Sequence, residues 1–226
     1  MTEGSHVAIA IDGPAASGKS TTAKLVAEKL GYLYIDTGAM YRALTTAVLE
    51  QKIPATDEKA VNVLAKQVDI RLVNTPAGLK TFLNGRDVSK AIRLPQVTQV
   101  ISKISAYKEV REIMKNKQRQ LAREGGVVMD GRDIGTVVLP DADVKIFMDA
   151  SVEERTQRRL DELRSKGVKI DREQIREEIV RRDQLDSTRD VAPLKPAPDA
   201  HVLDTSDLTV EEQVQRVLTI IEPLLH

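Results

Sequence analysis

The sequence predicts an α/β fold, in which a central parallel sheet carries helices on both faces and a small antiparallel insert is added. Short apolar runs alternate along the chain with segments whose apolar residues recur at helical spacing, as in such a sheet. One stretch shows instead the two-residue alternation of antiparallel strands. The length of 226 residues fits one compact domain with inserted lobes, so we expect a single domain over 1–226.

The first third of the chain predicts two strand–helix pairs and a third helix. A short apolar run that ends in Asp-Gly-Pro predicts a buried parallel strand, and apolar residues at helical spacing follow it. The same two patterns recur once, and we expect Thr56 to cap the third helix. The predicted elements are a strand over 7–11, a helix over 20–30, a strand over 32–35, a helix over 38–51 and a helix over 57–67.

The pattern changes after the third helix. Residues 68–72 and 79–83 alternate between apolar and polar side chains, and Asn84-Gly85 is typical of a tight hairpin turn. A hairpin does not fit within a series of parallel strands and helices. We therefore expect an inserted antiparallel lobe over 68–92.

The second half returns to the α/β pattern. It contains helical spacing, two further apolar runs, and a charge-rich stretch with a turn near Gly167. The predicted elements are a helical stretch over 96–124, strands over 126–129 and 144–148, a helical region over 152–190, a strand over 201–204 and a helix over 209–225.

Composition excludes several classes of function. Lys plus Arg and Asp plus Glu number 34 each, which argues against a general nucleic-acid binder or a polybasic membrane binder. A chain without cysteine has no disulfide, no thiol nucleophile and no cysteine zinc site. No apolar stretch reaches the ~18 residues of a bilayer span and no leader is visible, so we expect a cytoplasmic protein without nucleic-acid or membrane partners.

The strongest motif is a glycine-rich loop. Residues Gly13-Pro-Ala-Ala-Ser-Gly18-Lys19-Ser20 fit the pattern G-x-x-x-x-G-K-[ST] between a predicted strand and a predicted helix. Glycines let backbone N–H groups converge on phosphate oxygens, and the start of a helix adds a positive partial charge. Lys19 can reach the β- and γ-phosphates, and the Ser20 hydroxyl can ligate Mg²⁺. The motif therefore predicts a bound nucleoside triphosphate.

Several functions stay open for a protein with such a loop: a GTPase switch, a small-molecule kinase, or an ATP-driven motor or regulator. Guanine-reading GTPases usually carry Asn-Lys-x-Asp after a strand. The related Asn116-Lys117-Gln118-Arg119 lies inside a predicted helix and ends in Arg, which argues against guanine binding. A P-loop ATPase or regulator without a small-molecule acceptor is not excluded by the sequence.

Two more motifs follow predicted strands, and we expect them at the same carboxyl edge of the sheet as the glycine-rich loop. In Asp36-Thr-Gly-Ala-Met-Tyr-Arg42 the guanidinium suits a second phosphate, although a capped helix with a surface arginine would look the same. In Asp130-Gly-Arg132-Asp133 the strand ends in an acid suited to Mg²⁺, directly or through water. A turn stabilised by aspartate side chains is the other interpretation of this motif.

The segment 153–189 is rich in arginine, and two interpretations of it stay open. Pairs at i,i+4 spacing, such as Glu154 and Arg158, are typical of a solvated helical hairpin. A lid that brings arginine onto a transferring phosphoryl group would have the same composition. Together the motifs indicate a phosphoryl transferase with two phosphate sites, because that reaction requires mainly positioning and charge neutralisation.

Four motifs together resemble those of bacterial cytidylate kinases: Ile-Asp12-Gly-Pro-Ala-Ala-Ser-Gly-Lys-Ser20, Asp36-Thr-Gly-Ala-Met-Tyr-Arg42, Asp130-Gly-Arg-Asp-Ile-Gly-Thr136 and Arg189-Asp-Val-Ala-Pro-Leu194. The resemblance implies a P-loop kinase fold with a monophosphate-binding lobe that includes 68–92 and a helical lid over 152–190. It implies phosphoryl transfer from ATP to CMP or dCMP with Mg²⁺, within pyrimidine nucleotide metabolism. The expected partners are small nucleotides, and we expect a monomer.

The resemblance also assigns roles by position. The catalytic residues would be Lys19, Arg132 and Arg159. The ATP phosphates would contact Gly13, Pro14, Ala15, Ala16, Ser17, Gly18, Lys19, Ser20 and Thr21. CMP would contact Asp36, Thr37, Tyr41, Arg42, Ser102, Arg111, Arg132, Asp133, Arg182, Asp186 and Arg189. The magnesium ligands would be Ser20 and Asp130.

The cytosine contacts have a physical rationale. Cytosine presents an amino donor beside two acceptors, so the Asp133 carboxylate would accept from the amine and Arg111 would donate to the acceptors. Uracil presents an oxygen where cytosine has the amine, and an unpaired buried polar group costs about 1–3 kcal/mol. We therefore expect Asp133 and Arg111 to favour CMP over UMP.

Overall fold

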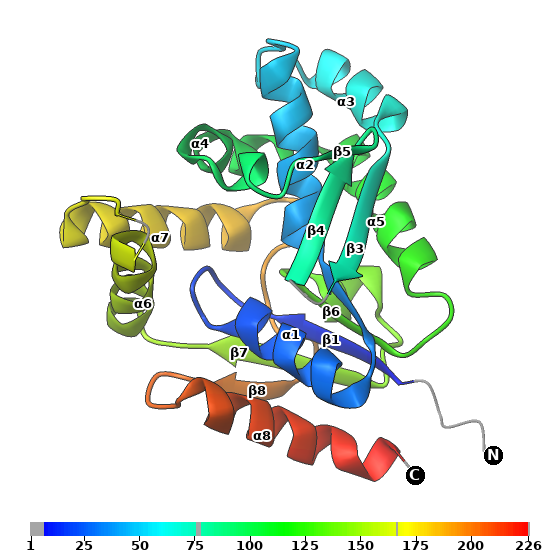
Figure 1. Ribbon diagram of the computed structural model, residues 1–226, viewed down its shortest axis with the longest axis vertical. Coiled ribbons are helices and arrows are strands. Elements are labelled where there is room, and N and C mark those ends of the chain that lie inside the picture. Colours follow the sequence, from blue (N-terminus) through cyan, green and yellow to red (C-terminus); the bar gives the residue numbers. More distant parts are fainter. Residues whose placement is uncertain (1–6, 76–77, 166, 226) are drawn as a thin grey trace. The chain divides into compact units, whose positions relative to one another are not determined.

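The computed structural model describes residues 7–75, 78–165 and 167–225. Contacts divide the chain into two compact units, which are Met1–Tyr32 with Gly125–His226 and, as the second unit, Leu33–Glu124 (Figure 1). Within the described ranges, no helix is both long and apolar enough to cross a membrane.

The first unit is built on parallel strands in the order β6-β1-β7-β8. Successive residues of a strand point to opposite faces of the sheet. Because Ile9, Ala10 and Ile11 are all fully buried, both faces of the sheet at β1 are covered, as the unbroken apolar run predicted. The strands are β1 (Ala8–Asp12), β6 (Val127–Gly131), β7 (Val144–Asp149) and β8 (His201–Asp204).

The helices of the first unit begin and end at recognisable capping residues. Gly31 ends α1 in the left-handed conformation, and Thr209 and Glu212 form a capping box at the start of α8. Apolar side chains of α6 and α7, which lie side by side in Figure 1, form a small core of their own. The helices are α1 (Lys19–Leu30), α6 (Val152–Ser165), α7 (Arg172–Thr188) and α8 (Val210–Ile221), with a π-helical turn at Ile134–Val138 and a 3-10 turn at Glu222–Leu224.

The second unit packs helices against a small antiparallel sheet. The sheet has the order β3-β4-β5, and Asn84-Gly85 forms the predicted turn between its last two strands. Met40, Leu44 and Met114 belong to its buried core. The elements are β2 (Leu33–Asp36), α2 (Thr37–Glu50), α3 (Glu58–Gln67), β3 (Ile70–Thr75), β4 (Gly78–Leu83), β5 (Arg86–Asp87), a 3-10 turn at Ala91–Arg93, α4 (Pro95–Ile104) and α5 (Lys108–Leu121). Residues 76 and 77 of the predicted insert lie outside the described residues.

The predicted fold class is confirmed, and two local predictions are wrong. Asp57, not Thr56, caps α3, because its carboxylate accepts from the Ala60 N–H at 3.0 Å. The helical stretch over 96–124 divides into α4 and α5, and the break contains no glycine or proline that would reveal it in the sequence. A tertiary contact fixes the break instead, since the Tyr107 hydroxyl donates to the Ala55 carbonyl at 2.6 Å.

Candidate functional site

The glycine-rich loop connects β1 to α1 and needs its glycines for steric reasons. Gly13 has φ 154°, and a Cβ there would lie 2.0 Å from the Met148 carbonyl oxygen. Gly18 has φ 90°, and a Cβ there would lie 2.7 Å from Oε1 of Gln213. Both positions combine a left-handed backbone with the close approach of another segment, so only glycine fits without displacement of a neighbour.

The glycine-rich loop contains two buried hydrogen-bond donors that could bind an anion, which are Lys19 and Ser17. Lys19 is 6% exposed and its Nζ donates to the Pro14 carbonyl at 3.0 Å. The buried Ser17 hydroxyl has no hydrogen-bond partner among the described residues. A buried donor without an acceptor is costly, and a phosphate oxygen would satisfy it. The loop therefore fits the phosphates of a nucleotide.

The two predicted magnesium ligands lie together. Asp130 is buried near the end of β6, directly opposite Ile11 of β1, while Ser20 stands in the first turn of α1. The Ser20 hydroxyl donates to Oδ2 of Asp130 at 2.6 Å. A hydroxyl and a carboxylate oxygen are the kind of ligand that Mg²⁺ takes from a protein when phosphates supply further oxygens.

Asp12 is a site residue that sequence reasoning missed. Its two carboxylate oxygens accept from the N–H groups of Ile134 and Gly135, each at 2.8 Å, and so fix the loop after Asp133. Burial raises the pKa of the Asp12 carboxyl to about 7, and these two hydrogen bonds oppose the rise only in part. The signal was present in the sequence, because an acid ends an apolar strand directly before the glycine-rich loop.

Five of the predicted substrate contacts form one cluster in the first unit, in which the two aspartates are buried and the three arginines are partly buried. Asp186 on α7 accepts from Nε of Arg132 at 2.9 Å, and it lies 4.0 Å from both Arg182 and Arg189. Arg189 also lies 3.6 Å from Asp133. These side chains carry three positive and two negative charges, so the cluster has a positive surplus that an anion would balance.

Burial and the neighbouring charges shift the pKa values of two residues in the cluster. Burial, with repulsion from Arg132, lowers the pKa of Arg182 to about 10. Burial alone would raise the pKa of Asp186, but Arg132 and Arg182 hold it below its usual value. The Nε of Arg182 is buried without a hydrogen-bond partner in the described part of the chain. A bound phosphate or hydroxyl would supply the missing acceptor.

The arginines of α6 have different surroundings. Arg159, the predicted catalytic residue, pairs with Glu162 at 2.7 Å, and its charge also lowers the pKa of Arg182. Arg155 is buried and donates to the Ala150 carbonyl at 2.9 Å, besides its ion pair with Asp183 at 2.5 Å. Arg155 therefore anchors α6 to its surroundings, whereas Arg159 contacts Glu162 on its own helix.

The second unit holds the motif that begins at Asp36. Asp36 caps α2, since its carboxylate accepts from the Ala39 N–H at 2.8 Å, and it also pairs with Arg93 at 3.0 Å. Arg42 donates to the Ile92 carbonyl at 3.1 Å and to the Thr98 hydroxyl at 2.9 Å. The helix is therefore capped, as the second interpretation of this motif expects, and the phosphate contact of Arg42 stays a prediction. Sequence reasoning missed Arg93.

The other predicted contacts in the second unit lie on α2, α4 and α5. The Arg111 guanidinium stacks 5.6 Å from the centre of the Tyr41 ring and donates to the Ser105 carbonyl at 3.0 Å. Thr37 is buried at the start of α2. Ser102 lies on α4, where its carbonyl accepts from the Ser105 hydroxyl at 3.3 Å. The structure therefore brings Tyr41 and Arg111 together.

Solved structures share this fold at low sequence identity. An uncharacterised protein from Eubacterium ventriosum ATCC 27560 aligns with a TM-score of 0.52 and 13% identity, over 96% of this chain and 98% of the other. Shikimate kinase from Bacteroides thetaiotaomicron aligns with a TM-score of 0.50 and 15% identity, over the same shares. These likenesses show the fold alone.

Sequence comparison is more specific. The curated cytidylate kinase of Bacillus cereus strain ATCC 10987 is 55% identical over 216 residues, which are 96% of each chain. That of Bacillus subtilis strain 168 is 52% identical over the same length and shares. A family model described as cytidylate kinase matches residues 9–223. With the phosphate loop, the Ser20–Asp130 pair and the arginine cluster in place, the chain belongs to the cytidylate kinase family.

Proposed function

We propose that this protein transfers the γ-phosphoryl group of ATP to CMP or dCMP and releases ADP with CDP or dCDP. The observation that carries the proposal is identity above 50% with cytidylate kinases over 96% of the chain. The arginine cluster supports it, because an ATPase or regulator without an acceptor has no use for a second anion site. The proposal is therefore favoured over an ATPase, a GTPase switch or a regulator without a small-molecule acceptor.

The donor side of the proposed reaction belongs to residues 13–21. Their backbone N–H groups and the start of α1 would hold the ATP phosphates. Lys19 would exchange the Pro14 carbonyl for phosphate oxygen, at little cost because its ammonium group is already desolvated. Ser20 and Asp130 would hold Mg²⁺, which supplies positive charge to the phosphates when bound.

The acceptor side belongs to the other predicted site residues. We propose that Arg42, Arg132 and Arg189 bind the CMP phosphate, that Ser102, Arg111 and Asp133 read cytosine, and that Arg182 and Asp186 bind the ribose. Asp36, Thr37 and Tyr41 would support these contacts. Arg132 and Arg159 would also stabilise negative charge on the transferring group. A phosphate acceptor is already a nucleophile at neutral pH, so the residues have only to orient it and to exclude water.

The broader assignments follow from the same reaction. We propose that residues 1–226 act as one kinase domain, in which 68–92 belong to the monophosphate-binding lobe and 152–190 act as a lid. The protein would work as a monomer on small nucleotides in the cytoplasm, within pyrimidine nucleotide metabolism, without nucleic-acid or membrane partners.

One assay tests the proposal. Purified protein is mixed with MgATP and each of CMP, dCMP, UMP, AMP and GMP, and ADP formation is followed. We expect ADP only when an acceptor is present, and fastest with CMP or dCMP. ADP release at the same rate without any acceptor would support an ATPase instead, and turnover with GTP alone as donor would support a GTPase.

A further inference from the structure

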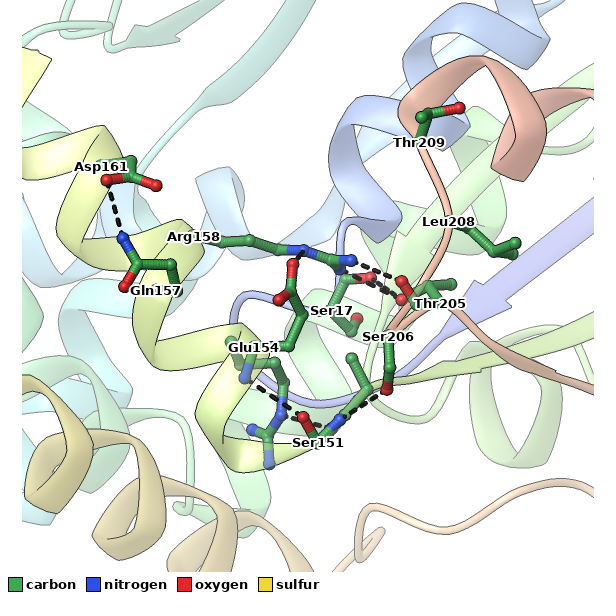
Figure 2. A network of polar contacts seen from close by, with 12 residues as sticks. Ser17, Ser151, Glu154, Gln157, Arg158, Asp161, Thr205, Ser206, Leu208 and Thr209 are labelled. Carbon is green, nitrogen blue, oxygen red and sulfur yellow. Dashed lines mark hydrogen bonds and ion pairs between the residues drawn. The ribbon is translucent and has the colours of Figure 1, made fainter.

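Thr205 joins the glycine-rich loop to α6, the first helix of the charge-rich segment. It is fully buried in the turn after β8. Its hydroxyl oxygen lies 3.0 Å from the Ser17 carbonyl oxygen and 2.9 Å from the Asp149 carbonyl oxygen. Nη1 of Arg158 donates to the same hydroxyl at 3.1 Å (Figure 2). Three segments of the first unit therefore meet at one hydroxyl group.

A hydroxyl has one proton to donate, and its surroundings decide where the proton goes. The lone pairs of the Thr205 hydroxyl receive the N–H of Arg158, so its proton is available for a carbonyl. The Asp149 carbonyl already accepts from the Thr205 backbone N–H at 2.8 Å. The Ser17 carbonyl is thus the acceptor that depends on the hydroxyl.

The direction of the Ser17 carbonyl sets the direction of the next amide. A trans peptide is planar, and its C=O and N–H point in opposite directions. When the Ser17 carbonyl points toward Thr205, the Gly18 N–H points away from Thr205. Gly18 is the second glycine of the phosphate-binding motif and precedes the first residue of α1. The hydroxyl therefore holds one of the amides that the motif uses for phosphate.

The hydroxyl is itself held rigidly. Arg158 donates to the backbone carbonyl of Thr205 as well as to its hydroxyl, and Nε of Arg158 donates to Glu154 at 2.9 Å (Figure 2). Buried Gln213 of α8 donates to the Leu208 carbonyl at 3.0 Å and so fixes the rest of the turn. A group held on several sides can direct the peptide that it contacts.

We propose that Thr205 is a positioning residue for the ATP site, which acts through the Ser17 carbonyl to orient the Gly18 amide. The inference rests on the proposed function, since it concerns the same nucleotide. It predicts a selective defect: loss of the hydroxyl weakens ATP binding, whereas the affinity for CMP stays unchanged.

The test compares three variants with the wild-type protein. Thr205→Val removes the hydroxyl and keeps the shape, and Thr205→Ser keeps the hydroxyl. Thr156→Val is the matched control, because Thr156 is equally buried but its hydroxyl donates to the Val152 carbonyl at 2.7 Å, within α6 itself. Isothermal titration calorimetry measures the Kd for ATP without CMP, steady-state kinetics gives KM for both nucleotides, and a thermal melt verifies folding.

We expect the Kd and KM for ATP to rise about tenfold in Thr205→Val, because the loss of one buried hydrogen bond has about that effect on an equilibrium constant. In Thr205→Ser and Thr156→Val, both values should stay within about twofold of the wild type. The KM for CMP should change by less than about twofold in all three variants. If Thr205→Val does not fold, the ATP affinities of Thr205→Ala and Thr205→Ser are compared instead, because these two variants also differ by the hydroxyl. Unchanged ATP affinity without the hydroxyl, or an equal loss in Thr156→Val, overturns the inference alone. A wild-type protein that does not bind ATP overturns the proposed function and the inference together.

Discussion

The glycine-rich loop and the arginine cluster are both suited to anions, but they are built in opposite ways. The loop is one continuous stretch, 13–21, that offers backbone N–H groups and owes its shape to left-handed glycines. The cluster is made of side chains from three places in the sequence, Arg132, Arg182 and Arg189, gathered around Asp186. Backbone dipoles carry no net charge, whereas buried guanidinium groups require counterions.

This difference shows what each region is sensitive to. The loop depends on conformation, so it is sensitive to glycine replacement and to the residues that hold its carbonyls. The cluster depends on charge balance, so removal of one carboxylate affects every arginine around it. We therefore expect the fold to tolerate the loss of Lys19, and we expect the loss of a cluster residue to lower stability.

The largest expected effect is on catalysis by the loop. Lys19→Ala should lower kcat for ADP formation by roughly a thousandfold, because a charge held against the transferring phosphoryl group is lost. The melting temperature should stay within a few degrees, which circular dichroism measures. Lys24→Ala is the control, since Lys24 is a half-exposed residue of the same helix that pairs with Glu28. Near-normal turnover in Lys19→Ala would contradict the donor site.

The next effect is a loss of protein stability when the charge balance of the cluster is changed. Asp186→Asn should lower the free energy of unfolding by about 3 kcal/mol, because three partly buried guanidinium groups lose their shared counterion. Urea unfolding measures this loss, with Asp161→Asn as an exposed control on α6. A loss no larger than that of the control would show that the cluster does not depend on charge balance.

A smaller effect concerns the choice of base. Asp133→Ala should reduce the ratio of kcat/KM for CMP to that for UMP by about tenfold, the value of one buried polar contact. Both substrates are measured with the same enzyme preparation, so a general loss of activity cancels in the ratio. If the ratio does not change, Asp133 does not read the base.

A further effect depends on pH and concerns the acid beside the loop. The pKa of Asp12 is about 7 in the folded protein, against an ordinary 3.8, so the folded state keeps a proton that the unfolded state releases. The free energy of unfolding should therefore fall as pH rises from about 4 to about 7, by at most about 1.4 kcal/mol per pH unit, and level off above.

Urea unfolding of the wild type and Asp12→Asn across this pH range isolates the contribution of Asp12, because asparagine does not titrate. The stability advantage of the wild type should shrink toward neutral pH. A difference that stays constant, or grows with pH, would show that Asp12 is ionised in the folded protein throughout.

Prediction from sequence succeeded where the signal is local. The strands, the hairpin turn at Asn84-Gly85 and the glycine-rich loop each depend on a few adjacent residues, and the structure has them. It failed at the break between α4 and α5, where Tyr107 finds its partner Ala55 only in the folded chain. It also placed the cap of α3 one residue early, because threonine and aspartate both favour a cap position and stand side by side there. Asp12 stands in the first of the four motifs but received no role there, and Thr205 lies in none of them. Both residues hold a loop in place through contacts that only the folded chain makes.

The sequence by itself determined the fold class, the phosphate loop and the family, because glycine positions, apolar periodicity and motif spacing all act over short distances along the chain. Only the tertiary structure decided which arginines gather around Asp186, which anchor α6, and which hydroxyl directs the Ser17 carbonyl. The physical reason is that desolvated charges and buried hydroxyls take their partners from remote segments, and burial sets the strength of those contacts.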